Sequence, residues 1–325
     1  MNSKNFWQEK ISIGSLVVPR FMSAPLDGLT TSPFRQIIRS FSPHELLFTE
    51  MRHVAHVSHD RKKITLTYDP IEQPLAFQFS ANAIDFIPEG VEKVINSGFV
   101  MINLNSGCPA KTVIRSGAGS ALMADLPRLE KIIKHFMTAI NGRVPFTLKI
   151  RAGFKEKNAL DVAHMAEACG VEALIIHPRT QPEGFSARLD FDLVQRIKAA
   201  LKIPVIFSGN INSFATAQLT YERTGVDGFM IGRALWGAPW KIRELTDAAQ
   251  EIPFTLQPKQ AVDTMIKHLD LNVQQLGSRT FVMIKKHIPL YIRTIPNAAM
   301  WRDKLLHALT EEEMRAILST LCTHL

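Results

Sequence analysis

The chain has 325 residues, 46% of them hydrophobic, and a formal net charge of +8. This length can bury a sizeable core, so it suits one large α/β domain with a small appendage, or two ordinary domains. No stretch has the roughly 18 consecutive apolar residues of a membrane span, and the N-terminus has no apolar signal segment, so we expect a cytoplasmic protein.

The cysteines and the net charge indicate which kinds of site and partner to expect. Cys108, Cys169 and Cys322 are widely spaced and odd in number, which argues against a disulfide framework and against a Cys-x-x-Cys metal site. We expect reduced thiols and no metal. The basic charge suits a polyanionic partner such as RNA, although basic proteins that bind no nucleic acid are also common.

Short apolar runs alternate with amphipathic stretches along most of the chain. Strands are expected over residues 20–26, 46–51, 74–80, 99–105, 145–151, 173–179, 204–210 and 228–234, with helices that include 84–97, 126–140, 158–169, 190–201 and 213–223. Near-continuous apolar runs are typical of parallel strands covered on both faces. The pattern favours an α/β fold, a (β/α)8 TIM barrel over about residues 20–240, with a doubly wound open sheet as the alternative.

Polar residues near the ends of the later strands favour the barrel. They are Gln78, Asn105, Lys149, Arg151, His177, Arg179, Asn210 and Arg233. Barrel enzymes place their chemistry at this face and draw it from many strands. Alternation points Lys149 inward, where a buried ammonium needs an anionic or electron-rich partner. The structural alternatives are an internal ion pair, with Glu50 as the main candidate, and a hydrogen-bonded core histidine at His177.

Two kinds of loop come after these strands. Gly107 and Pro109 stop any regular element, so Cys108 is expected on a loop directly after the fourth strand. The loops after the seventh and eighth strands carry small residues that let backbone N–H groups approach an anion. These loops predict a phosphate site built from Ser208, Gly209, Asn210, Gly232 and Arg233.

The character of the sequence changes after residue 240. The segment EIPFTLQP at 251–258 is expected to be a linker, and the chain beyond it has a helical pattern, so we expect a barrel domain over 1–245 and an all-helical domain over 253–325. The segment 277–306 contains six basic residues and one acidic residue. Contacts to RNA phosphates are expected from Lys285, Lys286 and Arg293, with an ordinary solvated helix face as the alternative.

Several segments together resemble the tRNA-dihydrouridine synthases, above all their bacterial B-type branch. They are, in order, SAPLDGLTTSPFR, NLNSGCPAKTVIRSGAGSALM, PFTLKIRAGF, LIIHPRT, IPVIFSGNI and FMIGRALWGAPW. The resemblance implies an FMN-bearing barrel, a helical tRNA-binding domain, and NADPH- or NADH-dependent reduction of the C5–C6 double bond of particular uridines. The chain has Asn103, Ser208 and Asn210 where the family usually has Asp, Asn and Asp.

The resemblance also implies roles for residues. The FMN-binding set is Ala24, Pro25, Leu26, Gln78, Lys149, His177, Ser208, Gly209, Asn210, Gly232 and Arg233. Asn105, Arg151 and Arg179 would hold the substrate uracil. Cys108 would donate the proton that accompanies hydride transfer, because an ordinary thiol is mostly protonated at neutral pH and can act as a general acid.

Two other functions stay open at this point. One is an FMN barrel that acts on a free small molecule, as in the dihydroorotate dehydrogenases. The other is a non-enzymatic RNA-binding protein built on a decayed barrel. We expect a monomer that has tRNA as its partner and no membrane partner.

Overall fold

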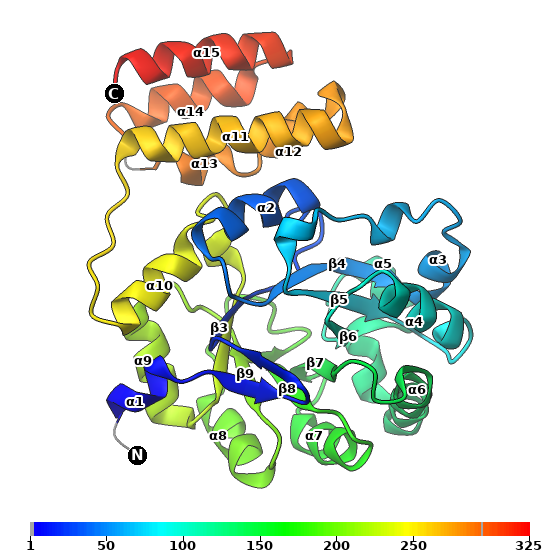
Figure 1. Ribbon diagram of the computed structural model, residues 1–325. Helices are drawn as coiled ribbons and strands as arrows, with labels where there is room; N and C mark the ends of the chain where they lie inside the picture. The colour runs from blue at the N-terminus through cyan, green and yellow to red at the C-terminus, as the bar shows by residue number, and fades with distance from the viewer. Residues whose placement is uncertain (1–2, 294) are drawn as a thin grey trace.

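Eight parallel strands form one sheet in the computed structural model, which describes residues 3–293 and 295–325. Their order is β3-β10-β9-β8-β7-β6-β5-β4, and the Ser23 N–H donates to the Leu46 carbonyl at 3.1 Å, which joins the two ends into a ring. The strands are β3 (Phe21–Ser23), β4 (Leu47–His53), β5 (Leu75–Ser80), β6 (Met101–Ser106), β7 (Phe146–Gly153), β8 (Ala173–Thr180), β9 (Val205–Ser208) and β10 (Gly228–Ile231). The predicted TIM barrel is confirmed, with all eight of its strands (Figure 1).

Helices surround this ring. They are α2 (Ser32–Phe41), α3 (Val54–His59), α4 (Ile87–Asn96), α6 (Leu126–Ile140), α7 (Ala159–Ala168), α8 (Phe191–Ala200), α9 (Phe214–Thr224) and α10 (Lys241–Ala249). Asp125, Asp190 and Ser213 each accept a hydrogen bond from a backbone N–H in the first turn of the following helix. Such caps satisfy donors that have no partner inside the helix, which explains why these helices begin where they do.

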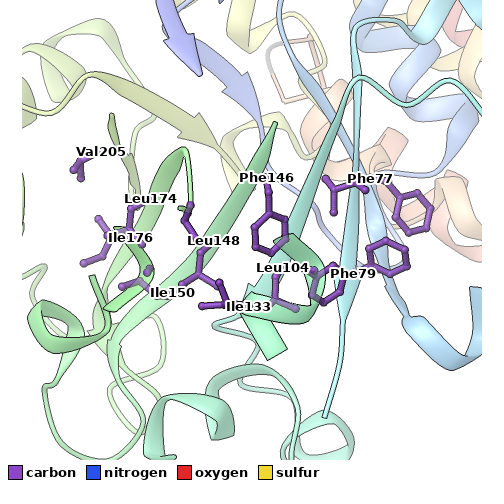
Figure 2. Packing of buried hydrophobic residues seen from close by; sticks show 14 of the residues in the cluster. Phe77, Phe79, Leu104, Ile133, Phe146, Leu148, Ile150, Leu174, Ile176 and Val205 are labelled. Atoms are coloured by element: carbon purple, nitrogen blue, oxygen red, sulfur yellow. The ribbon is translucent and has the colours of Figure 1, made fainter. Parts of the chain in front are cut away.

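The strands bury both faces. Outward side chains such as Leu104, Phe146, Leu148 and Ile150 pack with one another and with Ile133 of α6 (Figure 2). Inward side chains form a second apolar cluster that is joined by a two-stranded hairpin, β1 (Ile11–Ile13) and β2 (Leu16–Val18). The hairpin lies at the N-terminal end of the barrel, because a Cβ on Gly14 would touch Glu172 and Pro145, which precede β8 and β7. The opposite end is left for the site.

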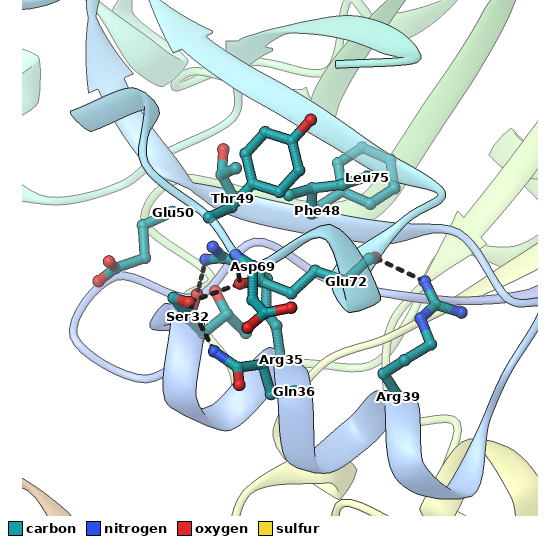
Figure 3. A network of polar contacts seen from close by, with 12 residues as sticks. Ser32, Arg35, Gln36, Arg39, Phe48, Thr49, Glu50, Asp69, Glu72 and Leu75 are labelled. Carbon is teal, nitrogen blue, oxygen red and sulfur yellow. Dashed lines mark hydrogen bonds and ion pairs between the residues drawn. The ribbon is translucent and has the colours of Figure 1, made fainter. Parts of the chain in front are cut away.

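A buried carboxylate holds α2 against the connection between β4 and β5 (Figure 3). Glu72, at the end of the short 3-10 helix η2 (Pro70–Glu72), pairs with Arg35 and accepts hydrogen bonds from the Ser32 hydroxyl and the Asp69 N–H. Arg39 donates to the Glu72 backbone carbonyl at 2.8 Å. Each charge has partners, which is the condition for burying an ion pair without a large desolvation cost.

The remaining helices gather beyond the linker and lie above α2 in Figure 1. They are α11 (Pro258–Leu276), α12 (Phe281–Ile284), α13 (Ile288–Tyr291), α14 (Ala298–His307) and α15 (Glu311–Thr323). Their apolar cluster includes Trp240 and packs against Phe41, so it continues onto the barrel. No helix in the described part of the chain is long and apolar enough to cross a membrane.

The helical region meets the barrel at close range. Phe34 of α2 stacks on His268 and lies 4.5 Å from the ring of His287. The Gly237 N–H donates to His287 Nδ1 at 3.3 Å. A Cβ on Gly237, whose φ is +66°, would lie 2.4 Å from the His287 carbonyl oxygen, so only glycine permits this approach.

The shorter elements complete the chain. They are α1 (Ser3–Gln8), η1 (Ile64–Leu66), α5 (Lys111–Arg115), η3 (Gly119–Ala124), η4 (Arg233–Leu235) and η5 (Ser278–Thr280). The loop that carries Cys108 joins β6 to α5, and η3 follows α5 in the chain.

Candidate active site

A cavity of about 920 Å³ lies at the C-terminal ends of the strands. Every residue that the sequence analysis assigned to the cofactor lines it: Ala24, Pro25, Leu26, Gln78, Lys149, His177, Ser208, Gly209, Asn210, Gly232 and Arg233. Cys108, Asn105, Arg151 and Arg293 line it as well. Residues scattered over most of the sequence therefore meet in one space, as expected of the C-terminal face of a barrel.

Lys149 points into this cavity from β7, while its neighbours Leu148 and Ile150 pack outward, as alternation predicted. No carboxylate pairs with its ammonium in the described part of the chain. Glu50 instead accepts from the Gly28 N–H at 2.7 Å and from Arg52 at 2.9 Å. Burial, together with the charge of Arg151, lowers the pKa of Lys149 to about 8, and Cys108 acts in the opposite direction. The ammonium needs a partner that the protein does not supply.

Three arginines add positive charge around Lys149, and each is bound to neutral acceptors. Arg151 donates to the carbonyls of Gly107 at 2.8 Å and Thr180 at 3.0 Å. Arg233 donates to Asn210 Oδ1 at 2.9 Å. Arg179 donates to the Ala187 carbonyl at 2.6 Å and lies 3.4 Å from His177 Nε2. Because neutral acceptors do not cancel these charges, the floor of the cavity fits an anionic or electron-rich ligand.

His177 stays neutral in this surrounding. Burial first, and then the charges of the surrounding cations, lower its pKa to about 2; these cations are Lys149, Arg151, Arg179 and Arg233. A neutral imidazole can offer one N–H and one acceptor nitrogen to a ligand. The two acidic residues on the cavity wall lie beside cations of their own, Asp27 at 3.7 Å from Arg52 and Glu244 at 2.7 Å from Lys241.

Cys108 lies on the loop between β6 and α5, as predicted, and is partly exposed to the cavity. Its backbone is held on both sides: its N–H donates to Asn105 Oδ1 at 2.8 Å, and its carbonyl accepts from the N–H and hydroxyl of Ser120 at 3.1 and 2.9 Å. A Cβ on Gly119 would lie 2.8 Å from the Cys108 carbonyl oxygen. The thiol therefore stands on an anchored loop.

Three of the predicted substrate contacts, Arg179, Lys285 and Lys286, do not line the cavity. Arg179 is buried beside His177 and donates to the Ala187 carbonyl in the loop after β8. The Lys285 ammonium donates to the Ala308 carbonyl at the end of α14, at 2.6 Å. Lys286 is exposed, and its ammonium lies 3.5 Å from the Gly28 carbonyl. Of the expected RNA contacts in the helical region, only Arg293 lines the cavity.

Phe185 lines the cavity and was not predicted from the sequence. Its side chain is 53% exposed, and its ring lies 4.6 Å from the Arg233 guanidinium and 5.8 Å from that of Arg151. The only signal was a single aromatic in the polar loop QPEGFSARLD. An exposed ring between two cations presents a flat apolar surface on which a planar ligand can stack.

The polar groups of the cavity are mainly cations and amides, with one imidazole and one thiol. No group of three or more His, Cys, Asp or Glu side chains that could hold a metal ion occurs among residues 3–293 and 295–325. This set of groups suits an organic ligand with carbonyl oxygens or a phosphate.

Comparison with known proteins places this arrangement in a family. The model of the dihydrouridine synthase (Dus) family matches residues 22–324. "Probable tRNA-dihydrouridine synthase 1" of Synechocystis sp. is 30% identical over 96% of this chain and 89% of that protein. "tRNA-dihydrouridine synthase B" of Pseudomonas aeruginosa is 31% identical over 90% of each. The solved old yellow enzyme homologue of Zymomonas mobilis, at 13% identity, covers 76% of this chain and 93% of its own with a TM-score of 0.56, which supports the fold.

Proposed function

Because the chain belongs to the dihydrouridine synthase family, we propose that the cavity above the barrel is the place where uridines of tRNA are reduced. The activity is reduction of the C5–C6 double bond of tRNA uridines, with FMN as cofactor and NAD(P)H as reductant. One observation carries the assignment of the site: the Cys108 thiol lines the same cavity as Lys149, Arg151 and Arg233, and none of these three cations forms an ion pair within the described residues.

FMN fits the residues of the cavity floor. When bound and reduced by NAD(P)H, it would supply the hydride for the double bond. Lys149, Gln78 and His177 would hold its ring system, and the Lys149 charge would favour the anionic form that a reduced flavin acquires. The segments 208–210 and 232–233 would hold its phosphate, where Arg233 has only a neutral partner. The backbone of Ala24–Leu26 would close the remaining side.

Cys108 would donate the proton to C5 of the uracil. Its anchored loop supports this role, because general-acid catalysis requires a donor held within hydrogen-bond reach of the accepting atom. Asn105 and Arg151 would orient the base. Asn105 can only donate to it through one free N–H, because its oxygen accepts from the N–H groups of Gly107 and Cys108 and its other N–H is given to Gln78. Arg179 would not contact the base; it would act indirectly, by holding His177 in place.

We further propose a division of labour along the chain. Residues 1–245 would hold FMN, and residues 253–325 would hold tRNA, with Arg293 and Lys286 as phosphate contacts near the cavity. The cavity is complete within one chain, which fits a monomer. Three free thiols and a tRNA substrate fit the cytoplasm.

The test uses the purified full-length protein, NADPH and tRNA that lacks dihydrouridine. We expect a yellow protein that releases FMN on denaturation, and nucleosides from the treated tRNA that have gained two hydrogens at uridine. A flavoprotein that oxidises NADPH with a small acceptor but leaves tRNA unchanged would support the small-molecule alternative. A protein that binds tRNA but no added FMN would support the non-enzymatic alternative.

A further inference from the structure

Four amide and hydroxyl side chains form a continuous chain of hydrogen bonds beneath the cavity. Asn105 Nδ2 donates to Gln78 Oε1 at 2.9 Å, Gln78 Nε2 donates to Asn103 Oδ1 at 2.7 Å, and Asn103 Nδ2 donates to Thr147 Oγ1 at 2.8 Å. Parallel register makes the chain possible, because Gln78 lies beside Asn103 and Asn103 lies beside Thr147 on β5, β6 and β7. Asn103 and Thr147 are completely buried, whereas Gln78 and Asn105 reach the cavity.

Backbone groups bind this chain at both ends. At one end, Asn105 Oδ1 accepts from the N–H groups of Gly107 and Cys108, which can only donate. The nitrogen of Asn105 must therefore face Gln78, so the Gln78 oxygen accepts and its nitrogen faces Asn103. The Asn103 oxygen then accepts in turn, and its nitrogen faces Thr147. At the other end, the Thr147 hydroxyl accepts from Asn103 and donates to the Ile102 carbonyl, which can only accept. The Asn105 end sets the direction, and the Thr147 hydroxyl, whose bond to the Ile102 carbonyl is 3.4 Å long, is satisfied in the same direction. An amide that turned over alone would place oxygen against oxygen or N–H against N–H at a neighbour.

We infer that Asn103 and Thr147 are positioning residues for the reduction of uridine. They touch neither the cavity nor its ligands; they act by fixing which way the amides of Gln78 and Asn105 face, and through Asn105 they hold the loop of Cys108. This inference rests on the proposed function of Cys108 and of the cavity.

The direction has a chemical consequence for the cavity. In each of the two amides that reach it, one N–H remains free, while the oxygen is already engaged. The free groups are therefore donors, in line with the cations around them, and they suit carbonyl oxygens of a flavin and of a uracil. If the chain were to reverse, acceptor oxygens would face those carbonyls and the Cys108 N–H would lose its partner.

The test compares two variants of Asn103 with the wild-type holoenzyme. Asn103→Leu leaves a buried Gln78 N–H without its acceptor, so Gln78 and, through it, Asn105 are held from one side only. Asn103→Asp keeps that acceptor, and its carboxylate is met by two donors because the Thr147 hydroxyl can rotate toward it. We expect Asn103→Leu to lower kcat for dihydrouridine formation by about tenfold to a hundredfold, with KM for tRNA unchanged, and Asn103→Asp to restore kcat.

Hydrogen exchange gives a readout that does not depend on activity. In Asn103→Leu, the peptide that contains Gly107 and Cys108 should exchange its amide hydrogens faster than in the wild type, whereas peptides of β9 and β10 should not change. Thr147→Val should move both readouts in the same direction and Thr147→Ser should not, which keeps the inference testable if Asn103→Leu does not fold.

Two results would overturn the inference. One is wild-type kcat together with wild-type exchange at Cys108 in Asn103→Leu. The other is an equal loss in Asn103→Leu and Asn103→Asp, since that would reflect general damage to the core. A wild-type protein that forms no dihydrouridine would instead refute the proposed function, and the exchange comparison would still decide whether the chain of amides holds the loop.

Discussion

Replacing Lys149 by methionine should make the flavin-free protein more stable while it weakens the site. Burial lowers the pKa of Lys149 from 10.5 to about 8. One pKa unit corresponds to about 1.4 kcal/mol, so below pH 8 the charged lysine costs the folded state about 3 kcal/mol relative to the unfolded chain. Lys149→Met removes that cost and fills the same space with an apolar side chain.

The pH dependence has a definite sign. Between about pH 8 and pH 10.5 the folded protein has released the Lys149 proton while the unfolded chain still holds it, so the wild type gains stability as pH rises through this window. The advantage of Lys149→Met should therefore be largest at pH 7 and fade toward pH 10.5. Urea unfolding of flavin-free protein at several pH values measures this difference. Lys155→Met, at an exposed lysine, is the matched control.

The pH dependence of FMN affinity should also depend on the charge of Lys149. An anionic ligand that restores the ordinary pKa of Lys149 must take up a proton when it binds above pH 8, so FMN affinity should fall by up to about tenfold per pH unit there. Lys149→Met should bind FMN more weakly and lose this pH dependence. Equal stability of variant and wild type at pH 7, or an advantage that persists at pH 10.5, would refute the reasoning.

Three further expectations concern the thiol, the tRNA contacts and the packing of α2. Cys108→Ala should keep FMN and tRNA yet form dihydrouridine about 10²- to 10⁴-fold more slowly; a loss of flavin alongside activity would make the cysteine structural. Replacing Lys286 and Arg293 by alanine should raise KM for tRNA and reduce the slope of log K against log salt by about one unit per lost contact. Lys285→Ala should not change this slope, because the Lys285 ammonium is bound to the Ala308 carbonyl. An unchanged slope in the double variant would mean that another surface binds the RNA. Glu72→Gln should lower the free energy of unfolding by about 3 kcal/mol, because Arg35 would remain buried without a counter-charge; a loss below about 1 kcal/mol would contradict the view that this pair holds α2.

The barrel could be predicted because its strands are buried on both faces. Such strands appear as continuous apolar runs, and all eight runs became strands. The β1–β2 hairpin was not predicted, since its strands have three residues each and are stabilised by contacts with the barrel interior rather than by a local pattern. Short strands of this kind carry little sequence signal.

The sequence predicts which side chains line the cavity where they lie at a strand end. Lys149 illustrates this, because alternation alone points it inward. The fate of Lys285 could not be predicted, because a run of basic residues does not say which ammonium meets the end of another helix. The chain through Asn103 and Thr147 was equally hidden, since it depends on the register of three strands that are far apart in the sequence.

The short segment from Gly232 to Trp240 connects the proposed phosphate site to the apolar core of the helical region. Its first part lines the proposed phosphate site, and its last part belongs to the apolar core of the helical region, with Gly237 pressed beneath His287. A segment so short and so tightly packed has little conformational freedom. By linkage, any gain in affinity for tRNA when flavin is bound equals the gain in affinity for flavin when tRNA is bound.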